Sequence, residues 1–249
     1  MSSIAVKLTN VGKKYKICYE KPTLMGSTLG QKTKKEFWAL KNINLTIKKG
    51  EKVGLTGLNG VGKSTLLKII AGLTTPTTGK LETNGKIATL MSLEAGFHPD
   101  LSGWENIYLN GMLVGMTKDE VRSKNKKILD YSEIGKFIEA PLYTYSDGMK
   151  FRLAFSIAIA SEFDILIIDE IITAGDIQFQ EKVLSTLEKI SKKRNITVII
   201  CSHFPQLVWR YSKTFFEIDK GGKLKKLARN EMLKRARENI EGWRKHLQL

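Results

Sequence analysis

The chain has 249 residues, 42% of them hydrophobic and 27% charged, which is the balance of a soluble globular protein with room for a sizeable core. Its longest apolar runs are far shorter than the roughly 20 residues that span a bilayer, and no signal peptide opens the sequence, so a cytosolic chain that does not cross a membrane by itself is expected. Cys18 and Cys201 have no metal-ligand spacing and are expected to be reduced packing residues.

The net charge of +16 comes entirely from the two ends of the chain. Residues 1–50 carry 11 Lys and 2 Glu (+9), residues 220–249 carry 10 Lys or Arg and 3 Glu (+7), and residues 51–219 hold 20 residues of each sign. Such basic ends suit nucleic acid or the anionic headgroups of a membrane surface, and charge alone does not choose between them.

Short strands are predicted at the start of the chain. Residues 4–8 alternate like an edge strand, and residues 45–47 and 53–56 flank a turn at Lys49-Gly50-Glu51. Between them, a lysine-rich stretch from Lys13 to Glu36 shows no clear periodicity.

A phosphate-binding loop pattern follows, between a predicted strand and a helix predicted at 65–71. The sequence there is Gly57-Leu58-Asn59-Gly60-Val61-Gly62-Lys63-Ser64-Thr65. Glycines let successive backbone N–H groups turn toward phosphate oxygens, and the helix N-terminus adds its dipole. Lys63 is expected to reach the β- and γ-phosphates and the Ser64 hydroxyl to bind Mg²⁺, so the pattern predicts a nucleotide site.

The middle of the chain, from about 98 to 162, is mostly helical by its periodicity. Helices are predicted at 104–113, 118–131 and 147–161, and Ser146 suits the N-cap of the last of them. Two β-branched runs beyond it, 165–168 and 197–200, are predicted to be strands buried on both faces. These elements predict an α/β core with a parallel sheet and a helical insertion.

Polar residues end both of these strands. Asp169 and Glu170 follow the first, where open α/β sheets bind ligands, so Asp169 is predicted to join the Mg²⁺ shell. Glu170 would then orient or deprotonate the attacking water. Ser202 and His203 end the second strand, which brings His203 to the same edge, where it could contact the γ-phosphate.

The C-terminal segment has the periodicity of an amphipathic helix, with apolar residues at steps of three or four. They are Leu224, Ala228, Met232, Ala236, Ile240, Trp243 and Leu247. The sequence leaves open whether this helix packs on its own domain, on a partner or on lipid.

Five segments occur in the order and spacing of ATP-binding cassette ATPases, over about residues 4–222. They are the phosphate loop, Tyr145-Ser146-Asp147-Gly148-Met149, the strand that ends at Glu170, Thr173-Ala174-Gly175-Asp176, and Ser202-His203. The resemblance implies a nucleotide-binding domain of residues 1–222 with a RecA-like core, a mostly parallel sheet and an N-terminal antiparallel β portion. It also implies a helical subdomain at about 96–162 and a basic insertion at about 16–37, followed by a basic amphipathic helix at 223–249.

In that family two nucleotide domains pair head to tail, and each ATP lies between one phosphate loop and the partner's signature motif. The resemblance implies a homodimer in which the signature, Ser146, Asp147, Gly148 and Met149, completes the other subunit's site. Ser146 and Gly148 would face the γ-phosphate there. Tyr15 resembles the aromatic residue that stacks on adenine, and Asp176 would lie in the loop that couples the two sites.

A narrower resemblance is carried by residues 94–109, Glu94 to Leu109, and by the YSDGM form of the signature. Both are similar to ATP-binding subunits of exporters that move lipid-linked polysaccharides of the O-antigen, capsule and wall teichoic acid group. This implies an integral-membrane permease as partner, a location at the cytoplasmic face of the membrane, and no nucleic-acid partner. The lysine-rich insertion would lie near the membrane, and residues 96–106 would meet the permease's coupling helix.

The chain departs from the family pattern at two places. Asp147 stands where the signature commonly has a second glycine and Met149 where it has a glutamine, which leaves the role of Asp147 open. The residue that supplies a Gln or Glu after the strand near 87–90 falls on Ser92 or Glu94, and the sequence does not choose between them.

Two other functions stay open on the sequence alone. A nucleic-acid-associated cassette ATPase would explain the charge of +16, although the chain has no tandem cassette, coiled-coil insertion or zinc-binding cysteines. A transport ATPase with a different cargo is the other. The identity of the glycan cannot be read from these residues.

Overall fold

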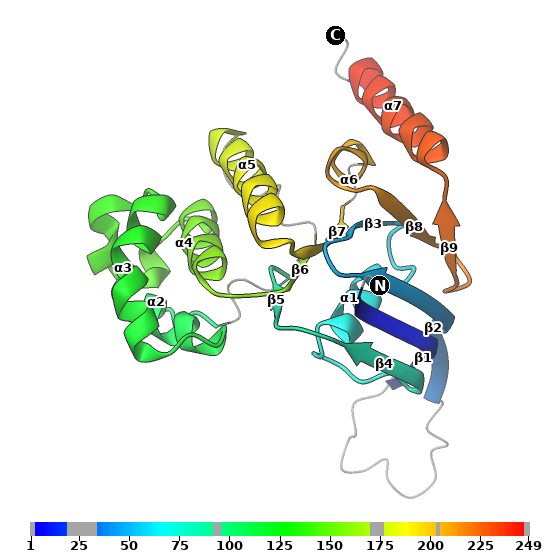
Figure 1. Ribbon diagram of the computed structural model, residues 1–249, viewed down its shortest axis with the longest axis horizontal. Coiled ribbons are helices and arrows are strands. Elements are labelled where there is room, and N and C mark those ends of the chain that lie inside the picture. Colours follow the sequence, from blue (N-terminus) through cyan, green and yellow to red (C-terminus); the bar gives the residue numbers. More distant parts are fainter. Residues whose placement is uncertain (1–2, 19–33, 92–95, 170–176, 203–204, 247–249) are drawn as a thin grey trace, which may run out of the picture.

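The computed structural model describes residues 3–18, 34–91, 96–169, 177–202 and 205–246 (Figure 1), with residues 17, 18, 34, 35, 177, 206, 207 and 239–246 described by their backbone alone. The strands are β1 (Ile4–Cys18), β2 (Lys34–Lys48), β3 (Lys52–Thr56), β4 (Thr78–Thr83), β5 (Ile87–Thr89), β6 (Ile165–Asp169), β7 (Thr197–Cys201), β8 (Thr214–Ile218) and β9 (Leu224–Leu227). The helices are α1 (Lys63–Ile70), α2 (Gly103–Leu113), α3 (Lys118–Ser132), α4 (Asp147–Ala160), α5 (Ile177–Arg194), α6 (Pro205–Tyr211) and α7 (Arg229–His246), with 3₁₀ turns η1 (Gly135–Glu139) and η2 (Leu142–Thr144).

These strands form two sheets, as the α/β prediction requires. One is antiparallel, in the order β2-β1-β4, and the other runs β5-β6-β7-β3-β8-β9, parallel except for the β8–β9 pair. Among the described residues, no helix is both long enough and apolar enough to cross a membrane.

Successive side chains of β6 point alternately to the two faces of the parallel sheet and join a different part of the core on each face. Ile165 and Ile167 join a cluster with α1 and the antiparallel sheet, whereas Leu166 and Ile168 join one with α4 and α5. Since successive side chains of a strand point to opposite faces, this all-apolar run can be buried on both sides. Helix α1, which follows the phosphate loop, and helix α4, which begins after Ser146, thus lie on opposite faces of one sheet (Figure 1).

Helices α2, α3 and α4 and the turns η1 and η2 pack around an apolar cluster of their own, within the range of about 96–162 for which a helical subdomain was predicted. Ser102 and Thr117 start α2 and α3 with capping boxes that use Glu105 and Glu120. Ser146 is the N-cap of α4, as predicted, because its hydroxyl accepts from the Met149 N–H at 3.2 Å.

One prediction about the N-terminal strands was wrong. β1 is the central strand of its sheet, with β2 on one side and β4 on the other, and it is not an edge strand. The lysine-rich stretch contributes paired strand at both ends, since Tyr15 lies opposite Phe37 and Cys18 opposite Lys34. That part of the hairpin extends beyond the last β1–β4 pair, Gly12 with Thr78, so little of it is buried and its sequence carries no apolar alternation.

The helix predicted from Leu224 begins five residues later. Residues 224–227 are β9, whose Leu224 and Leu227 lie opposite Ile218 and Phe215 of β8. The turn at Gly222, with a φ of 74°, reverses the chain and puts these residues beside the open edge of β8. Leu224 and Leu227 point to opposite faces of this strand, because Leu224 packs against the cluster that includes α1 and Leu227 joins the cluster that includes Met232.

The start of α7 packs on its own domain. Met232 is fully buried in a cluster with Val208, Phe215 and Leu227, and Ala236 is buried as well. For the described side chains of this helix, the question that the sequence left open is therefore decided in favour of its own domain.

Candidate functional site

The phosphate-loop residues connect β3 to α1, and glycine is required at two of their positions. Gly57 has a φ of 143° and Gly62 a φ of 108°. A Cβ on Gly57 would lie 2.6 Å from the Ile218 carbonyl oxygen, and one on Gly62 would lie 2.5 Å from that of Ala39. The loop is thus pressed against neighbouring backbone and keeps its curved shape.

The first turn of α1 is built to receive an anion. Its N-cap is Gly62, which has no side chain to occupy the N–H groups, and its first turn holds no acidic residue. Helix N-termini with open N–H groups favour negative charge. The Ser64 side chain is exposed on this turn, and Thr65 is half-buried.

Lys63 is buried and reaches back over the loop. Its ammonium donates hydrogen bonds of 2.9 Å to the carbonyl oxygens of both Gly57 and Leu58. Lys63 thus places a buried positive charge at the start of a helix. When a phosphate binds, its oxygens could take the place of the two carbonyl oxygens as partners of the ammonium.

Two cavities lie on either side of this loop. The first, of about 330 Å³, is lined by Tyr15, Phe37, Ala39, Asn59, Gly60, Gly62, Lys63, Ser64 and Thr65. The second, of about 480 Å³, is lined by Thr56, Gly57, Leu58, Asn59, Ser202, Pro205, Glu217 and Arg235. Val61 is the exception among the loop residues, because its side chain packs against the core.

The first cavity has an aromatic wall that sequence reasoning found only in part. Tyr15 on β1, named from the sequence for its resemblance to the aromatic residue that stacks on adenine, lines this cavity, and Phe37, directly opposite on β2, lines it too. Both rings are substantially exposed. The sequence held one signal for Phe37. It stands at the end of the lysine-rich stretch, where an aromatic residue is not needed for packing and can serve a ligand instead.

The second cavity brings in two residues that sequence reasoning missed. Arg235 of α7 donates to both carboxylate oxygens of Glu217 on β8, at 2.6 and 3.1 Å, and to Glu231 at 3.2 Å. Only the fold reveals this, because the pair depends on α7 docking beside β8.

Asp169 ends β6 with one carboxylate oxygen unsatisfied. Its Oδ1 is buried and accepts no hydrogen bond within the described part of the chain. An orphaned carboxylate oxygen is costly unless a ligand satisfies it, and Mg²⁺ prefers such hard oxygen ligands. Asp169 and the exposed hydroxyl of Ser64 therefore fit Mg²⁺. The described residues hold no cluster of three acidic, His or Cys side chains.

Strand order brings these groups to one sheet edge. Cys201 of β7 lies opposite both Leu55 of β3 and Asp169 of β6, so the phosphate loop, Ser202 and Asp169 follow three neighbouring strand ends. Cys201 itself is buried in the core, as predicted for a packing residue. Five residues named from the sequence, Glu170, His203, Asp176, Ser92 and Glu94, lie outside the described residues.

The signature residues form a separate group at the start of α4. Asp147 is 92% exposed, and its carboxylate lies 3.5 Å from the Lys150 ammonium. Ser146 is exposed too, Gly148 is half-buried, and Met149 packs against the helical subdomain. Within one chain, the structure does not bring this group to the phosphate loop, since α4 and α1 lie in different layers (Figure 1).

Tyr145 anchors the signature. Its buried hydroxyl donates to the Phe137 carbonyl, and burial, with a smaller effect from Glu139, raises the pKa of Tyr145 to about 12. The phenol therefore stays protonated near neutral pH and keeps its hydrogen bond, which fixes the backbone just before Ser146.

Comparisons with known proteins agree with this geometry. The sequence profile of the family described as "ABC transporter" matches residues 40–173. The "O-antigen export system ATP-binding protein RfbB" of Myxococcus xanthus is 49% identical over 183 residues, which are 74% of this chain and 42% of that protein. The protein of the same name from Klebsiella pneumoniae is 44% identical over 169 residues, 68% of each chain.

A third relative and a solved structure extend the comparison. The "Teichoic acids export ATP-binding protein TagH" of Bacillus cereus is 42% identical over 200 residues, 80% of this chain and 36% of that protein. The chain thus spans between 36% and 68% of these three relatives. The dimeric structure of the ATP-binding cassette MJ0796 in a post-hydrolysis state with ADP and Pi superposes with a TM-score of 0.72 at 28% identity, over 90% of this chain and 99% of that one.

Proposed function

The chain belongs to the ABC transporter family, and on that premise we propose that it is the ATP-hydrolysing subunit of an exporter of lipid-linked polysaccharide. The observation that carries this proposal is the phosphate loop between β3 and α1, with its uncapped helix start and its buried Lys63. The cargo is inferred from relatives named for O-antigen and teichoic acid export.

Each nucleotide-binding residue then has a distinct task. The N–H groups of the loop and the Lys63 ammonium bind the phosphates, and Glu170 orients the attacking water or removes its proton. His203 contacts the γ-phosphate. Asp169 and Ser64 would hold Mg²⁺, and a bound Mg²⁺ would supply positive charge against the phosphates.

The catalytic unit is a homodimer. Helices α4 and α1 lie in different layers of one chain (Figure 1), which supports a signature that completes the phosphate site of a second copy, with Ser146 and Gly148 at its γ-phosphate. The head-to-tail pairing is supported by the likeness to a cassette solved as a dimer with ADP and Pi. Asp176 would couple the two sites.

The aromatic wall of the first cavity binds adenine, and this can be tested directly. Replacing Tyr15 or Phe37 with alanine is expected to weaken Mg-ATP binding by about tenfold, because stacking of a base on an aromatic ring contributes roughly 1–3 kcal/mol. Calorimetric titration with ATP measures the change. Tyr143→Ala, at an exposed ring on the helical subdomain, is the control; equal affinities for all three variants would place adenine elsewhere.

Export requires a membrane partner, proposed to be an integral-membrane permease subunit that is present in two copies. The homodimer of this subunit would bind it at the cytoplasmic face of the membrane. An exposed apolar patch at the end of α2, Met112, Leu113 and Val114, suits this contact. Leu113 lies against Gly96, in the region expected to meet the permease. The basic chain ends would lie near anionic headgroups, at about 1 kcal/mol per residue close to the surface.

This docking predicts which apolar residue the permease needs. In coexpression with the permease, affinity purification of the parent subunit should recover the complex, and Leu113→Asp should reduce recovery by about tenfold or more. Leu73→Asp makes the same change at a leucine that is 58% exposed, against 65% for Leu113. This control should recover the complex as the parent does.

Two results would contradict these expectations. Stable capture of DNA or RNA at physiological salt, with no membrane subunit, would overturn the transport proposal in favour of a nucleic-acid-associated ATPase. Equal loss in both leucine variants would remove the docking role from the α2 patch.

A further inference from the structure

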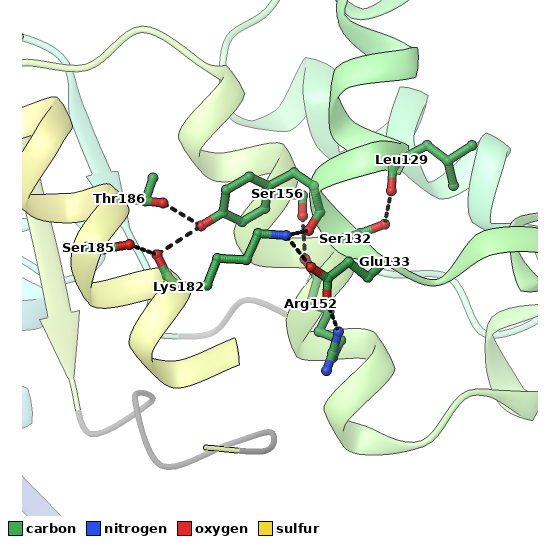
Figure 2. A network of polar contacts seen from close by, with 9 residues as sticks. Leu129, Ser132, Glu133, Arg152, Ser156, Lys182, Ser185 and Thr186 are labelled. Atoms are coloured by element: carbon green, nitrogen blue, oxygen red, sulfur yellow. Dashed lines mark hydrogen bonds and ion pairs between the residues drawn. The ribbon is translucent and has the colours of Figure 1, made fainter. Parts of the chain in front are cut away.

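One carboxylate joins the helical subdomain to the core. Glu133, the residue that ends α3, accepts from the Arg152 guanidinium of α4 at 2.7 Å through one oxygen. Through the other it accepts from the Lys182 ammonium of α5 at 2.6 Å. Figure 2 shows Lys182 reaching from α5 to this carboxylate, with Arg152 on its other side. Three helices from distant parts of the sequence therefore meet at one side chain.

Each cation is held by more than the carboxylate. Lys182 also donates to the Tyr131 carbonyl at 2.7 Å and lies 4.3 Å from the centroid of the Tyr131 ring. The Arg152 guanidinium lies 4.5 Å from the centroid of the Phe179 ring on α5, and the Tyr131 hydroxyl donates to Thr186. The hydrogen bond from Lys182, and that from Arg152, hold the pKa of Glu133 below its usual value although partial burial opposes this, so the carboxylate is ionised near neutral pH.

The positions of the two cations link this cluster to the nucleotide site. Arg152 lies one and a half turns into α4, the helix that begins after Ser146, and Lys182 lies in the second turn of α5, the helix that begins after Asp176. Beneath them α4 and α5 meet through aromatic rings, with Phe151 and Phe155 both edge-on to Phe179. The burial of apolar surface between these helices is not directional in itself, whereas hydrogen bonds between charged groups fix a geometry.

The backbone at Glu133 points to the same conclusion. Its φ of 56° and ψ of 24° are left-handed, a conformation that glycine adopts without strain at the end of a helix. Glu133 is half exposed, against 19% for Arg152 and 30% for Lys182, and ion pairs with exposed partners contribute little to stability. A glutamate here is therefore better explained by the contacts that it directs than by the stability of the fold.

We propose that Glu133 is a positioning residue that sets the orientation of α4 against α5, and with it the placement of Ser146 and Gly148 against the partner's phosphate loop. This inference rests on the proposed function, because it concerns how one subunit presents its signature to the other. The new element is that the orientation of α4 against α5 is fixed by the ionic contact of Glu133 with Arg152 and Lys182, and not by apolar packing alone.

The test separates nucleotide binding by one subunit from pairing of two. Glu133→Gln removes the charge at constant size, and Glu133→Gly removes the carboxylate while relieving the backbone. Glu181→Gln, at an exposed position of α5 next to Lys182, makes the same change of charge and is the control. All are made in the Glu170→Gln background, and three quantities are measured: thermal unfolding, Mg-ATP affinity of the dilute subunit, and the ATP-dependent dimerisation constant by sedimentation.

Both Glu133 variants are expected to bind Mg-ATP within about twofold of the parent and to unfold at a similar temperature, while their dimerisation constants weaken by about fivefold or more. Lys182→Met should weaken dimerisation as well, and its combination with Glu133→Gln should cost less than the sum of the two. A parent-like dimerisation constant in both Glu133 variants would overturn the inference. Failure of the parent itself to dimerise with ATP would instead reject the proposed function.

Discussion

A Glu170→Gln variant is expected to release phosphate from ATP at least about a hundredfold more slowly than the parent, the lower range of what a positioned general base contributes. Glu170 directly follows Asp169, the last residue of β6, whose buried Oδ1 marks this sheet edge as a ligand site. An amide of the same size cannot remove the proton from the attacking water. ATP should therefore stay bound between two subunits, and a dimer should accumulate in size-exclusion chromatography with ATP.

The control for this result is Glu162→Gln. Glu162 is exposed on the loop that precedes β6, so the substitution makes the same chemical change at the opposite end of the same strand. Its turnover should equal that of the parent. If Glu170→Gln also hydrolyses ATP at the parent rate, Glu170 has no part in activating the water, and the base must be sought elsewhere at the sheet edge.

Replacing Lys63 with methionine is expected to lower the affinity for Mg-ATP by about tenfold or more. A hydrogen bond from a charged donor contributes roughly 1.5–3 kcal/mol, and each 1.4 kcal/mol is a factor of ten. Part of this is offset, because the ammonium already donates to the carbonyls of Gly57 and Leu58 before phosphate arrives. Methionine keeps the apolar stem and removes only the charge, so equilibrium titration with ATP isolates the effect.

Lys68→Met provides the comparison within the same helix. Lys68 is exposed in the last turn of α1, away from the loop, and its variant should bind ATP like the parent. Thermal unfolding of both variants checks that α1 stays folded. Equal ATP affinities in the two variants would contradict the role assigned to Lys63.

The core of the fold could be predicted because its elements carry strong local signals. The run 165–168 is apolar throughout and lies in a sheet covered on both faces, and Ser146 caps α4 as its residue type predicts. Helix α5 went unpredicted, although Phe179, Val183, Leu184 and Leu187 are buried on one side of it. These residues lie at helical steps along the sequence, so the signal for α5 was present there.

The parts of the site whose residues are close together in the sequence could be predicted. The parts whose residues meet only through tertiary contacts could not. The phosphate loop needs its glycines and Lys63 in one short segment, so sequence pattern alone locates it. Phe37, Arg235 and Glu133 gain their positions from a cross-strand pair, a docked helix and a three-helix junction. No spacing along the sequence encodes these contacts.

The register of the parallel sheet also determines which residues could alter the turnover rate when they are substituted. Neighbouring strands lie about 4.8 Å apart, and the ladder that pairs Leu55 with Cys201 and Cys201 with Asp169 is made of backbone hydrogen bonds. Side-chain substitution can scarcely alter the distances among the groups at that edge. If Glu133 positions the signature as proposed, substitutions in the side chains that join α3, α4 and α5 are expected to change the turnover rate while the groups at this sheet edge keep their spacing.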